Sequence, residues 1–157
     1  DQGIVKNLIH HLKYKNQPHI GQFLGNWYGQ VLKEANALNN IDIVIPVPLH
    51  KKKLNKRGYN QVSGFAKRIA YHLNAVYMEH ILVKTANTRT QTKKNRLYRW
   101  RGMPDLYKVT HPEFLCNKNV LLVDDVITTG ATMEACARAI KKAKDVSVSV
   151  AAMAVVP

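Results

Sequence analysis

Four apolar residues at positions 120–123 run directly into two adjacent aspartates, and this junction restricts the fold more than any other feature of the chain. A short, uninterrupted apolar run is typical of a strand that is buried on both faces of a parallel sheet. In such a sheet, ligands bind at the edge formed by the carboxyl ends of the strands. The sequence therefore predicts that Asp124 and Asp125 lie at the ligand-binding edge of an α/β domain.

Segments with helical and strand patterns alternate along the chain. Helices are predicted at residues 3–16, 20–38, 62–73 and 132–143, and strands at residues 41–47, 76–83, 120–123 and 146–156. This alternation predicts a single domain built on a parallel sheet that is covered by helices on both faces. Residues 84–118 are polar, basic and weakly periodic, which is typical of a loop that is functional or disordered.

The predicted helix at residues 20–38 contains a set of large apolar residues and a row of glycines. Six large apolar side chains are expected on one side of it: Phe23, Leu24, Trp27, Tyr28, Val31 and Leu32. Gly21, Gly25 and Gly29 recur at every fourth position. Because glycine lowers helix stability, we interpret this row as one that permits close packing.

Positive charge is concentrated in two blocks. Residues 51–68 and 84–101 hold 14 of the 24 lysines and arginines, and the net charge is +14. Such an excess indicates anionic partners, either phosphorylated metabolites or nucleic acid. The alternative is a solvated basic face. Because both blocks fall in predicted loops, we favour an anion-binding site.

Other features exclude several classes of protein. The longest apolar run, residues 150–156, has seven residues, far fewer than a membrane span needs, and the first residues lack the layout of a signal peptide. The sequence therefore predicts no membrane association and a cytoplasmic location. Cys116 and Cys136 have no partner at zinc-ligand spacing, so we expect reduced thiols and no zinc. The chain begins without methionine, so we expect a fragment or a processed product.

The residues after the acid pair have the composition of a phosphate-binding loop. Thr128, Thr129, Gly130, Ala131 and Thr132 are small, and they open directly into a predicted helix. Exposed N–H groups at a helix start bind phosphate, and adjacent carboxylates suit the hydroxyl groups of a sugar. Together these features indicate a sugar phosphate as the ligand. The alternative interpretation is a polar loop followed by an N-cap.

Residues 120–132 resemble, without a mismatch, the signature that binds phosphoribosyl pyrophosphate (PRPP) in type I phosphoribosyltransferases. The resemblance implies a Rossmann-like open parallel sheet. It also implies that the catalytic pair Asp124 and Asp125 binds the ribose hydroxyls, that residues 128–132 bind the 5′-phosphate, and that Mg²⁺ is held through PRPP near the two acids. In the 6-oxopurine salvage enzymes an acid replaces Thr128 and a lysine replaces Ala131, which argues against hypoxanthine or guanine as the acceptor.

Further segments resemble the competence protein ComF family, a phosphoribosyltransferase-like group whose members are often labelled amidophosphoribosyltransferase. They are residues 13–15 (Lys-Tyr-Lys), 45–50 (Ile-Pro-Val-Pro-Leu-His), 57–61 (Arg-Gly-Tyr-Asn-Gln) and 90–92 (Thr-Gln-Thr), with Arg99. Lys94 and Gly102 depart from the family pattern. The family's upstream cysteine zinc module is absent from this sequence, as is a glutaminase half. We therefore expect any amide-nitrogen chemistry to need ammonia or a partner.

The resemblance assigns two loops to the pyrophosphate of PRPP. The pyrophosphate loop, which follows the first strand, contains Leu49, His50, Lys51 and Arg57. The flexible loop, which closes over PRPP in this class, contains Arg89, Gln91 and Arg99; its cations would offset charge on the leaving group, and its closure would exclude water. General acid catalysis by His50 is one hypothesis, and the alternative that we favour is a solvated or hydrogen-bonding residue.

These features predict a phosphoribosyltransferase that uses Mg–PRPP and an unidentified small nitrogenous acceptor, and that releases pyrophosphate. Residues 1–38 are expected to form a helical flank or hood on a core of residues 39–157. DNA, through the basic loops, and a second copy of the chain are further partners that the sequence leaves open. The alternative function is a catalytically silent protein of this fold that acts in DNA uptake or binds nucleic acid. The basic blocks favour this alternative, whereas the intact acid pair and phosphate loop oppose it.

Overall fold

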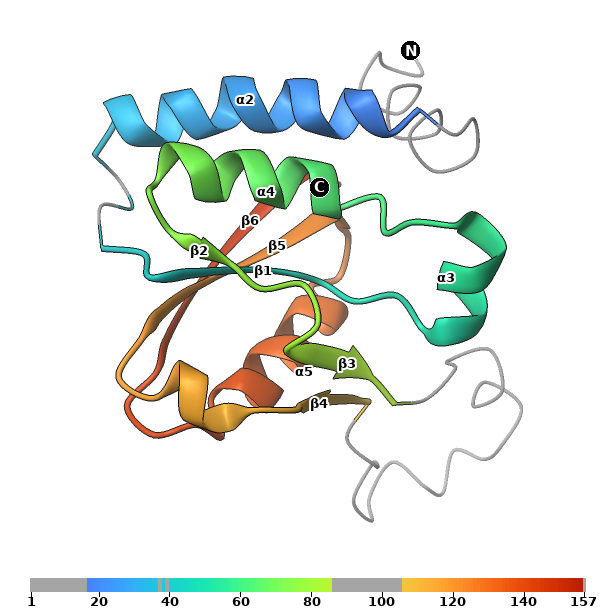
Figure 1. Cartoon of the computed structure of the whole chain (residues 1–157), viewed down its shortest axis with the longest axis vertical. Coiled ribbons are helices and arrows are strands. Elements are labelled where there is room, and N and C mark those ends of the chain that lie inside the picture. Colours follow the sequence, from blue (N-terminus) through green and yellow to red (C-terminus); the bar gives the residue numbers. More distant parts are fainter. Residues whose placement is uncertain (1–16, 37, 39, 86–105, 157) are drawn as a thin grey trace.

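The computed structural model describes residues 17–36, 38, 40–85 and 106–156. In this part of the chain, a four-stranded parallel sheet has the strand order β2-β1-β5-β6 (Figure 1). Its strands are β1 (Ile43–Pro46), β2 (Val76–Tyr77), β5 (Asn119–Ile127) and β6 (Ser147–Val155). The α-helices are α2 (Pro18–Glu34), α3 (Lys51–Arg57), α4 (Ser63–His72) and α5 (Ala131–Ile140). The predicted α/β fold with a parallel sheet is confirmed, while the helix predicted at residues 3–16 lies outside the described residues.

The direction in which the sheet grows reverses between its two central strands. From β1 the chain passes through α3 and α4 to β2 on one side, and from β5 it passes through α5 to β6 on the other side. The connections that leave β1 and β5 lie on opposite faces of the sheet. This reversal is the topological switch point of the sheet, and α/β proteins bind ligands at the carboxyl ends of the strands at such a point.

Each face of the sheet has its own hydrophobic core. On one face, α4 buries Phe65 and Ile69 against the sheet, and α2 lies on the outer side of α4 (Figure 1). On the other face, α5 buries Met133, Cys136 and Ile140. Residues 120–123 of β5 are fully buried and alternate between the two cores. The apolar run therefore forms the doubly buried strand that its composition predicts.

Helix α2 packs on α4 through its glycine row. The three glycines of the row are buried, and a Cβ added at Gly25 would lie 2.6 Å from the carbonyl oxygen of Phe65. The close packing predicted from the row is thus confirmed. The six large apolar residues do not share one environment, because Phe23, Trp27 and Val31 are exposed, Phe23 to 72%. Two backbones that approach this closely leave only a narrow contact stripe, and these three side chains fall outside it.

Three other segments differ from the sequence prediction. Residues 76–83, expected as one strand, are divided by the polar residues Glu79 and His80 into β2 and β3 (Leu82–Lys84). Strand β3 leaves the sheet and pairs antiparallel with β4 (Tyr107–Val109), which is followed by the 3₁₀ helix η3 (Pro112–Leu115). Segment 84–118 therefore contains regular structure at its ends. The basic segment after β1, expected as a loop, forms α3, which His50 caps at its start and the left-handed Gly58 caps at its end.

Candidate functional site

The acid pair lies at the carboxyl edge of the sheet, beside the switch point. Strand β1 pairs with β5 as far as Val123, whereas β6 follows β5 to Ile127. Asp124 and Asp125 therefore lie just beyond the end of β1 while still belonging to β5, which corrects the expectation that the strand ends at residue 123. Both residues are buried, and the Asp125 backbone N–H donates to Asp124 Oδ1 at 2.8 Å.

The loop after β5 enters α5 through a left-handed glycine. Gly130 has a φ of +74° and is the N-cap of α5, a conformation that favours glycine. Thr129 Oγ1 accepts a hydrogen bond from the Ala131 backbone N–H at 3.4 Å. Residues 128–132 line one hollow together with Asp124. The structure thus brings the predicted phosphate loop and the acid pair together at a helix start, where backbone N–H groups create positive potential.

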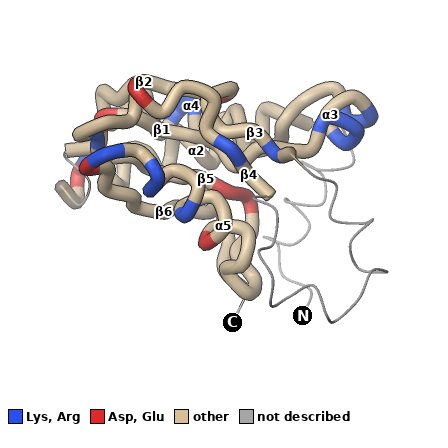
Figure 2. The backbone as a smooth tube through the Cα atoms, turned by 90° about the horizontal axis from the view of Figure 1, so that it is seen from below, with Lys and Arg blue, Asp and Glu red and all other residues tan. Residues whose placement is uncertain are grey.

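The four residues predicted to contact pyrophosphate lie in the connection from β1 to α4, at the same edge. Leu49 precedes the cap of α3, Lys51 is the first residue of this helix, and Arg57 is the last. His50 Nδ1 accepts from the Lys52 backbone N–H at 3.3 Å, so the ring has the hydrogen-bonding role that we favour for it. Figure 2 shows the basic residues of α3 at one end of the molecule, with the acids of β5 nearer to its middle. Contact of these residues with pyrophosphate stays a prediction.

Two buried side-chain amides, to which the sequence alone gives no role, attach the segment between β1 and α4 to its surroundings. Asn60 Nδ2 donates to the carbonyl oxygen of Val47 at 3.0 Å. Gln61 Nε2 donates to Asp125 Oδ2 at 2.8 Å, and Gln61 Oε1 accepts from the Arg57 guanidinium. The available signal was the run at residues 57–61, which resembles the ComF pattern. The sequence does not reveal the contact itself, because Asp125, the partner of Gln61, lies 64 residues further along the chain.

Lys84, which is one of many cations in the sequence, brings positive charge near the acid pair in the structure. It ends β3, and its Nζ lies 5.1 Å from the centre of the Tyr107 ring. Burial is the main cause that lowers the pKa of Lys84, Lys53 lowers it further, and Asp124 opposes the shift. A half-buried cation beside a second cation is stabilised when an anion approaches. Lys84 therefore extends the anion-attracting surface from α3 to the hairpin.

Below the phosphate loop, Tyr107 and Cys136 form a buried polar contact. Burial is the main cause that raises the pKa of both groups, that of the thiol to about 12. Tyr107 and Cys136 lie in the same hydrophobic core as Met133 and Ile140 of α5. Because a protonated thiol is a weak nucleophile, Cys136 has a packing role, and the contact attaches the hairpin to the start of α5.

Arg89, Gln91 and Arg99, the residues predicted for the flexible loop, lie outside the described residues. The described segments on either side of this loop are β3 and β4, in which Lys84 pairs with Tyr107. The loop therefore leaves from and returns to a hairpin that is attached to the start of α5.

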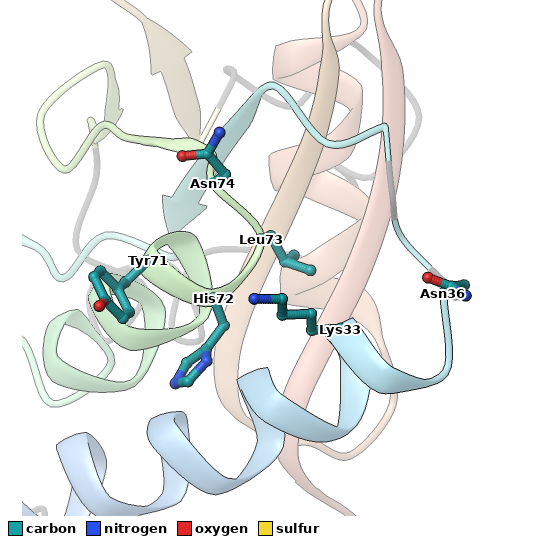
Figure 3. Close-up of a pocket in the computed structure, with 6 residues that line it drawn as sticks. All are labelled: Lys33, Asn36, Tyr71, His72, Leu73 and Asn74. Atoms are coloured by element: carbon teal, nitrogen blue, oxygen red, sulfur yellow. The ribbon is translucent and has the colours of Figure 1, made fainter.

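A cavity much larger than the hollow at the phosphate loop lies away from the acid pair. A hollow of about 650 Å³ opens where α2 and α4 end, at the amino-terminal edge of the sheet (Figure 3). Its lining residues are Lys33, Asn36, Tyr71, His72, Leu73 and Asn74. The hollow at the phosphate loop measures only about 30 Å³. Because the larger hollow has no carboxylate and lies at the opposite edge of the sheet, cavity volume does not locate the chemistry.

No helix within residues 17–36, 38, 40–85 and 106–156 is long and apolar enough to cross a membrane. No group of three or more histidine, cysteine, aspartate or glutamate side chains in them could hold a metal ion.

The chain is similar in sequence to a known domain family and to several named proteins. A family model described as "Phosphoribosyl transferase domain" matches residues 62–156. Competence protein F of Haemophilus influenzae is 28% identical over 140 residues, which cover 86% of this chain and 61% of that protein. DNA utilization protein YhgH of Salmonella typhimurium is 25% identical over 129 residues, which cover 80% of this chain and 56% of that protein. The chain thus spans less than two thirds of the length of these relatives.

Among solved structures, glutamine PRPP amidotransferase from B. subtilis superposes with a TM-score of 0.62 at 20% sequence identity, covering 90% of this chain and 30% of that chain. Likeness at this level of identity shows the fold, and it confirms the open parallel sheet expected for a type I phosphoribosyltransferase. The family model covers more than half of the chain and includes the acid pair and the phosphate loop. The chain therefore belongs to the phosphoribosyltransferase domain family, and its resemblance to the ComF competence proteins is confirmed.

Proposed function

We propose that this protein binds PRPP together with Mg²⁺ and transfers the phosphoribosyl group to a nitrogen nucleophile, with release of pyrophosphate. The observation that supports the proposal is the single hollow at the switch point, which Asp124 and the loop at the start of α5 line together. Carboxylates suit sugar hydroxyls, and a helix start suits a phosphate. A ribose 5-phosphate group carries its hydroxyls and its phosphate close together, so one ligand can contact both parts of the hollow.

In this proposal each part of the site contacts one part of PRPP. Residues 128–132 hold the 5′-phosphate, and Asp124 and Asp125 hold the 2′ and 3′ hydroxyls of the ribose. The pyrophosphate then extends towards α3 and Lys84, where the positive charge is concentrated. Cations in that position stabilise the charge that develops on the leaving group.

The acid pair fits a magnesium ion that arrives with its substrate. Mg²⁺ in such sites is bound by one or two carboxylates together with substrate phosphates, and it does not require a cage of protein ligands. Asp124 and Asp125, which are adjacent and buried at the end of β1, supply this set of oxygen donors. When bound, the ion neutralises charge on the pyrophosphate oxygens and makes pyrophosphate a better leaving group.

The reaction breaks the bond between C1 of the ribose and a pyrophosphate oxygen and forms a bond between C1 and the acceptor nitrogen. The electron pair of the broken bond leaves with pyrophosphate, and the acceptor nitrogen gives up a proton to solvent. The protein holds the ribose in place and surrounds the leaving group with cations. Its catalysis in this proposal therefore comes from positioning and electrostatics.

Calorimetry with Mg–PRPP tests the proposal. Asp125→Asn keeps the size of the side chain and an acceptor for Gln61 but removes a charge, so we expect binding to weaken about ten-fold or more. The matched control is Glu113→Gln, which changes an exposed acid of η3 and should leave the affinity unchanged. A wild-type protein that does not bind Mg–PRPP, or an Asp125→Asn variant that binds it equally well, would contradict the proposal. A screen of bases and amines for pyrophosphate release then identifies the acceptor.

Nucleic-acid binding is a second candidate function, and the surface of α3 favours it. Lys51, Lys52, Lys53 and Lys56 are exposed on this short helix, and one relative is named as a DNA utilization protein. Closely spaced, exposed cations bind the phosphate backbone without base specificity. A protein that binds single-stranded DNA but not Mg–PRPP would support this candidate over the first.

A further inference from the structure

We propose that Gln61 is a positioning residue, which orients the Asp125 carboxylate for ribose binding and links it to Arg57. The sugar end and the pyrophosphate end of one ligand would then be recognised through one chain of hydrogen bonds. This inference rests on the proposed function. Its basis is the chain of contacts from Arg57 through Gln61 to Asp125, which crosses the switch point from the segment after β1 to the end of β5.

The orientation of the Gln61 amide is determined by its two partners. A carboxylate only accepts hydrogen bonds, and a guanidinium only donates them. Nε2 of Gln61 must therefore face Asp125, at 2.8 Å, and Oε1 must face Arg57. Hydrogen bonds to charged groups are stronger than those between neutral groups, and Gln61 is only 7% exposed. Water therefore competes poorly for either bond.

The neighbouring residue Asn60 shows what a purely structural amide does at this point of the chain. Its side chain donates to the Val47 carbonyl oxygen and accepts from the Val62 backbone N–H, so both of its partners are backbone groups. Gln61 instead contacts two charged side chains, one at each end of the candidate site. A neutral amide between a cation and a carboxylate orients both groups while adding no charge of its own.

This arrangement connects the two ends of the site mechanically. An anion that draws Arg57 towards itself also shifts the Gln61 amide, and the shift reaches the carboxylate of Asp125. In addition, hydrogen bonds that are linked in a buried chain polarise and strengthen one another. PRPP contacts both ends in the proposed function, whereas inorganic phosphate at residues 128–132 contacts neither Arg57 nor Asp125. Changes at Gln61 should therefore affect the first ligand and not the second.

Two substitutions separate the two bonds. Gln61→Met keeps the length of the side chain and removes both bonds, while Gln61→Glu keeps an acceptor for Arg57 and replaces the donor to Asp125 with a carboxylate. Urea unfolding first confirms that each variant is folded, and calorimetry then measures Mg–PRPP and inorganic phosphate separately. We expect both variants to bind Mg–PRPP about ten-fold more weakly or worse. Phosphate binding should change by less than about three-fold, because the loop shares no partner with Gln61.

The matched control is Asn60→Ala, which removes a buried amide that contacts only backbone. It should lower stability while leaving Mg–PRPP affinity within about three-fold of wild type. Equal affinity of both Gln61 variants and wild type, or an equal loss in Asn60→Ala, would overturn the positioning role. Weakening by Gln61→Met alone would overturn the part of the proposal that concerns Asp125. A wild-type protein that does not bind Mg–PRPP would instead indicate that the proposed function itself has failed.

Discussion

Gly25→Ala should destabilise this protein, although alanine is the better helix former. Gly25 lies on the buried face of α2, where a Cβ would be 2.6 Å from the carbonyl oxygen of Phe65 and 2.9 Å from both Phe65 Cα and Arg68 Cβ. A carbon atom normally lies about 3.3 Å or more from a carbonyl oxygen. Helix α2 must therefore move away from α4 by about 0.7 Å. Because the obstacle is backbone, no side-chain rotation relieves it.

The size of the effect follows from two opposing contributions. Helix propensity favours alanine over glycine by about 1 kcal/mol. Overpacking costs about 1–3 kcal/mol, and the upper end applies because the shift also separates Tyr28 from Phe65, whose stacked ring centres are 5.9 Å apart. The net result is a loss of about 2 kcal/mol in the free energy of unfolding. For a chain of this length, that corresponds to a decrease in Tm of about 4–8 °C.

Urea unfolding monitored by circular dichroism measures this change, and Gly29→Ala is the matched comparison. A Cβ at Gly29 would meet the His72 side chain, with Cδ2 at 2.8 Å and Cβ at 3.0 Å. The double variant Gly29→Ala/His72→Ala removes the ring but keeps the Cβ, so it should recover part of the stability lost. Truncating Arg68 should give no such recovery in Gly25→Ala, because the Phe65 backbone remains. If Gly25→Ala is as stable as wild type, the two helices do not pack as closely as described and the reasoning fails.

Three further changes test other parts of the structure. Burial raises the pKa of Cys136 from 9.0 to about 12, so the stability from this protonated thiol is complete below pH 9.0 and is lost as the pH rises towards 12. In urea unfolding under reducing conditions, Cys136→Ala should therefore remove about 1.4 kcal/mol per pH unit from the alkaline decline, and an equal decline in both proteins would contradict this. Thr129→Ala removes the acceptor for the Ala131 N–H and should lower the free energy of unfolding by about 0.5 kcal/mol; unchanged urea midpoints would refute that role. The triple variant Lys51→Ala/Lys52→Ala/Lys53→Ala should weaken single-stranded DNA binding and reduce the slope of log affinity against log salt by about 0.7 per lost contact, whereas an unchanged slope in fluorescence anisotropy would exclude these lysines from DNA binding.

Local sequence patterns predict those elements whose environment depends mainly on their own residues. The run at 120–123 is apolar at every position because it meets a core on each face of the sheet, so composition alone indicates its burial. Gly130 and the small residues around it indicate the turn into α5 because few other residues tolerate a φ of +74°. The acid pair and the phosphate loop are neighbours in the chain. Their proximity in space therefore requires no knowledge of the tertiary structure.

Local patterns do not predict the burial or the strand pairing of elements whose environment depends on distant residues. In α2, the glycines and the large apolar side chains both recur with helical period, and only contact with α4 decides which stripe is buried. Phe23 and Trp27 are exposed for this reason. Residues 76–83 have the composition of one strand, but β3 pairs with β4, which lies beyond the long loop. The division into two sheets therefore could not be deduced from the segment itself.

The basic block at residues 51–68 shows the same limit within the candidate site. The sequence alone does not distinguish its seven cations from one another. In the structure they differ in exposure and in their partners. Lys51, Lys52 and Lys53 are exposed on α3, where they suit an extended anion such as nucleic acid. Arg57, at the end of the same helix, is partly buried and contacts Gln61, whose other partner is Asp125. Substituting the exposed lysines therefore tests the binding of both anions, PRPP and nucleic acid, whereas substituting Gln61 tests the binding of PRPP alone, although all of these residues lie within one short stretch of the chain.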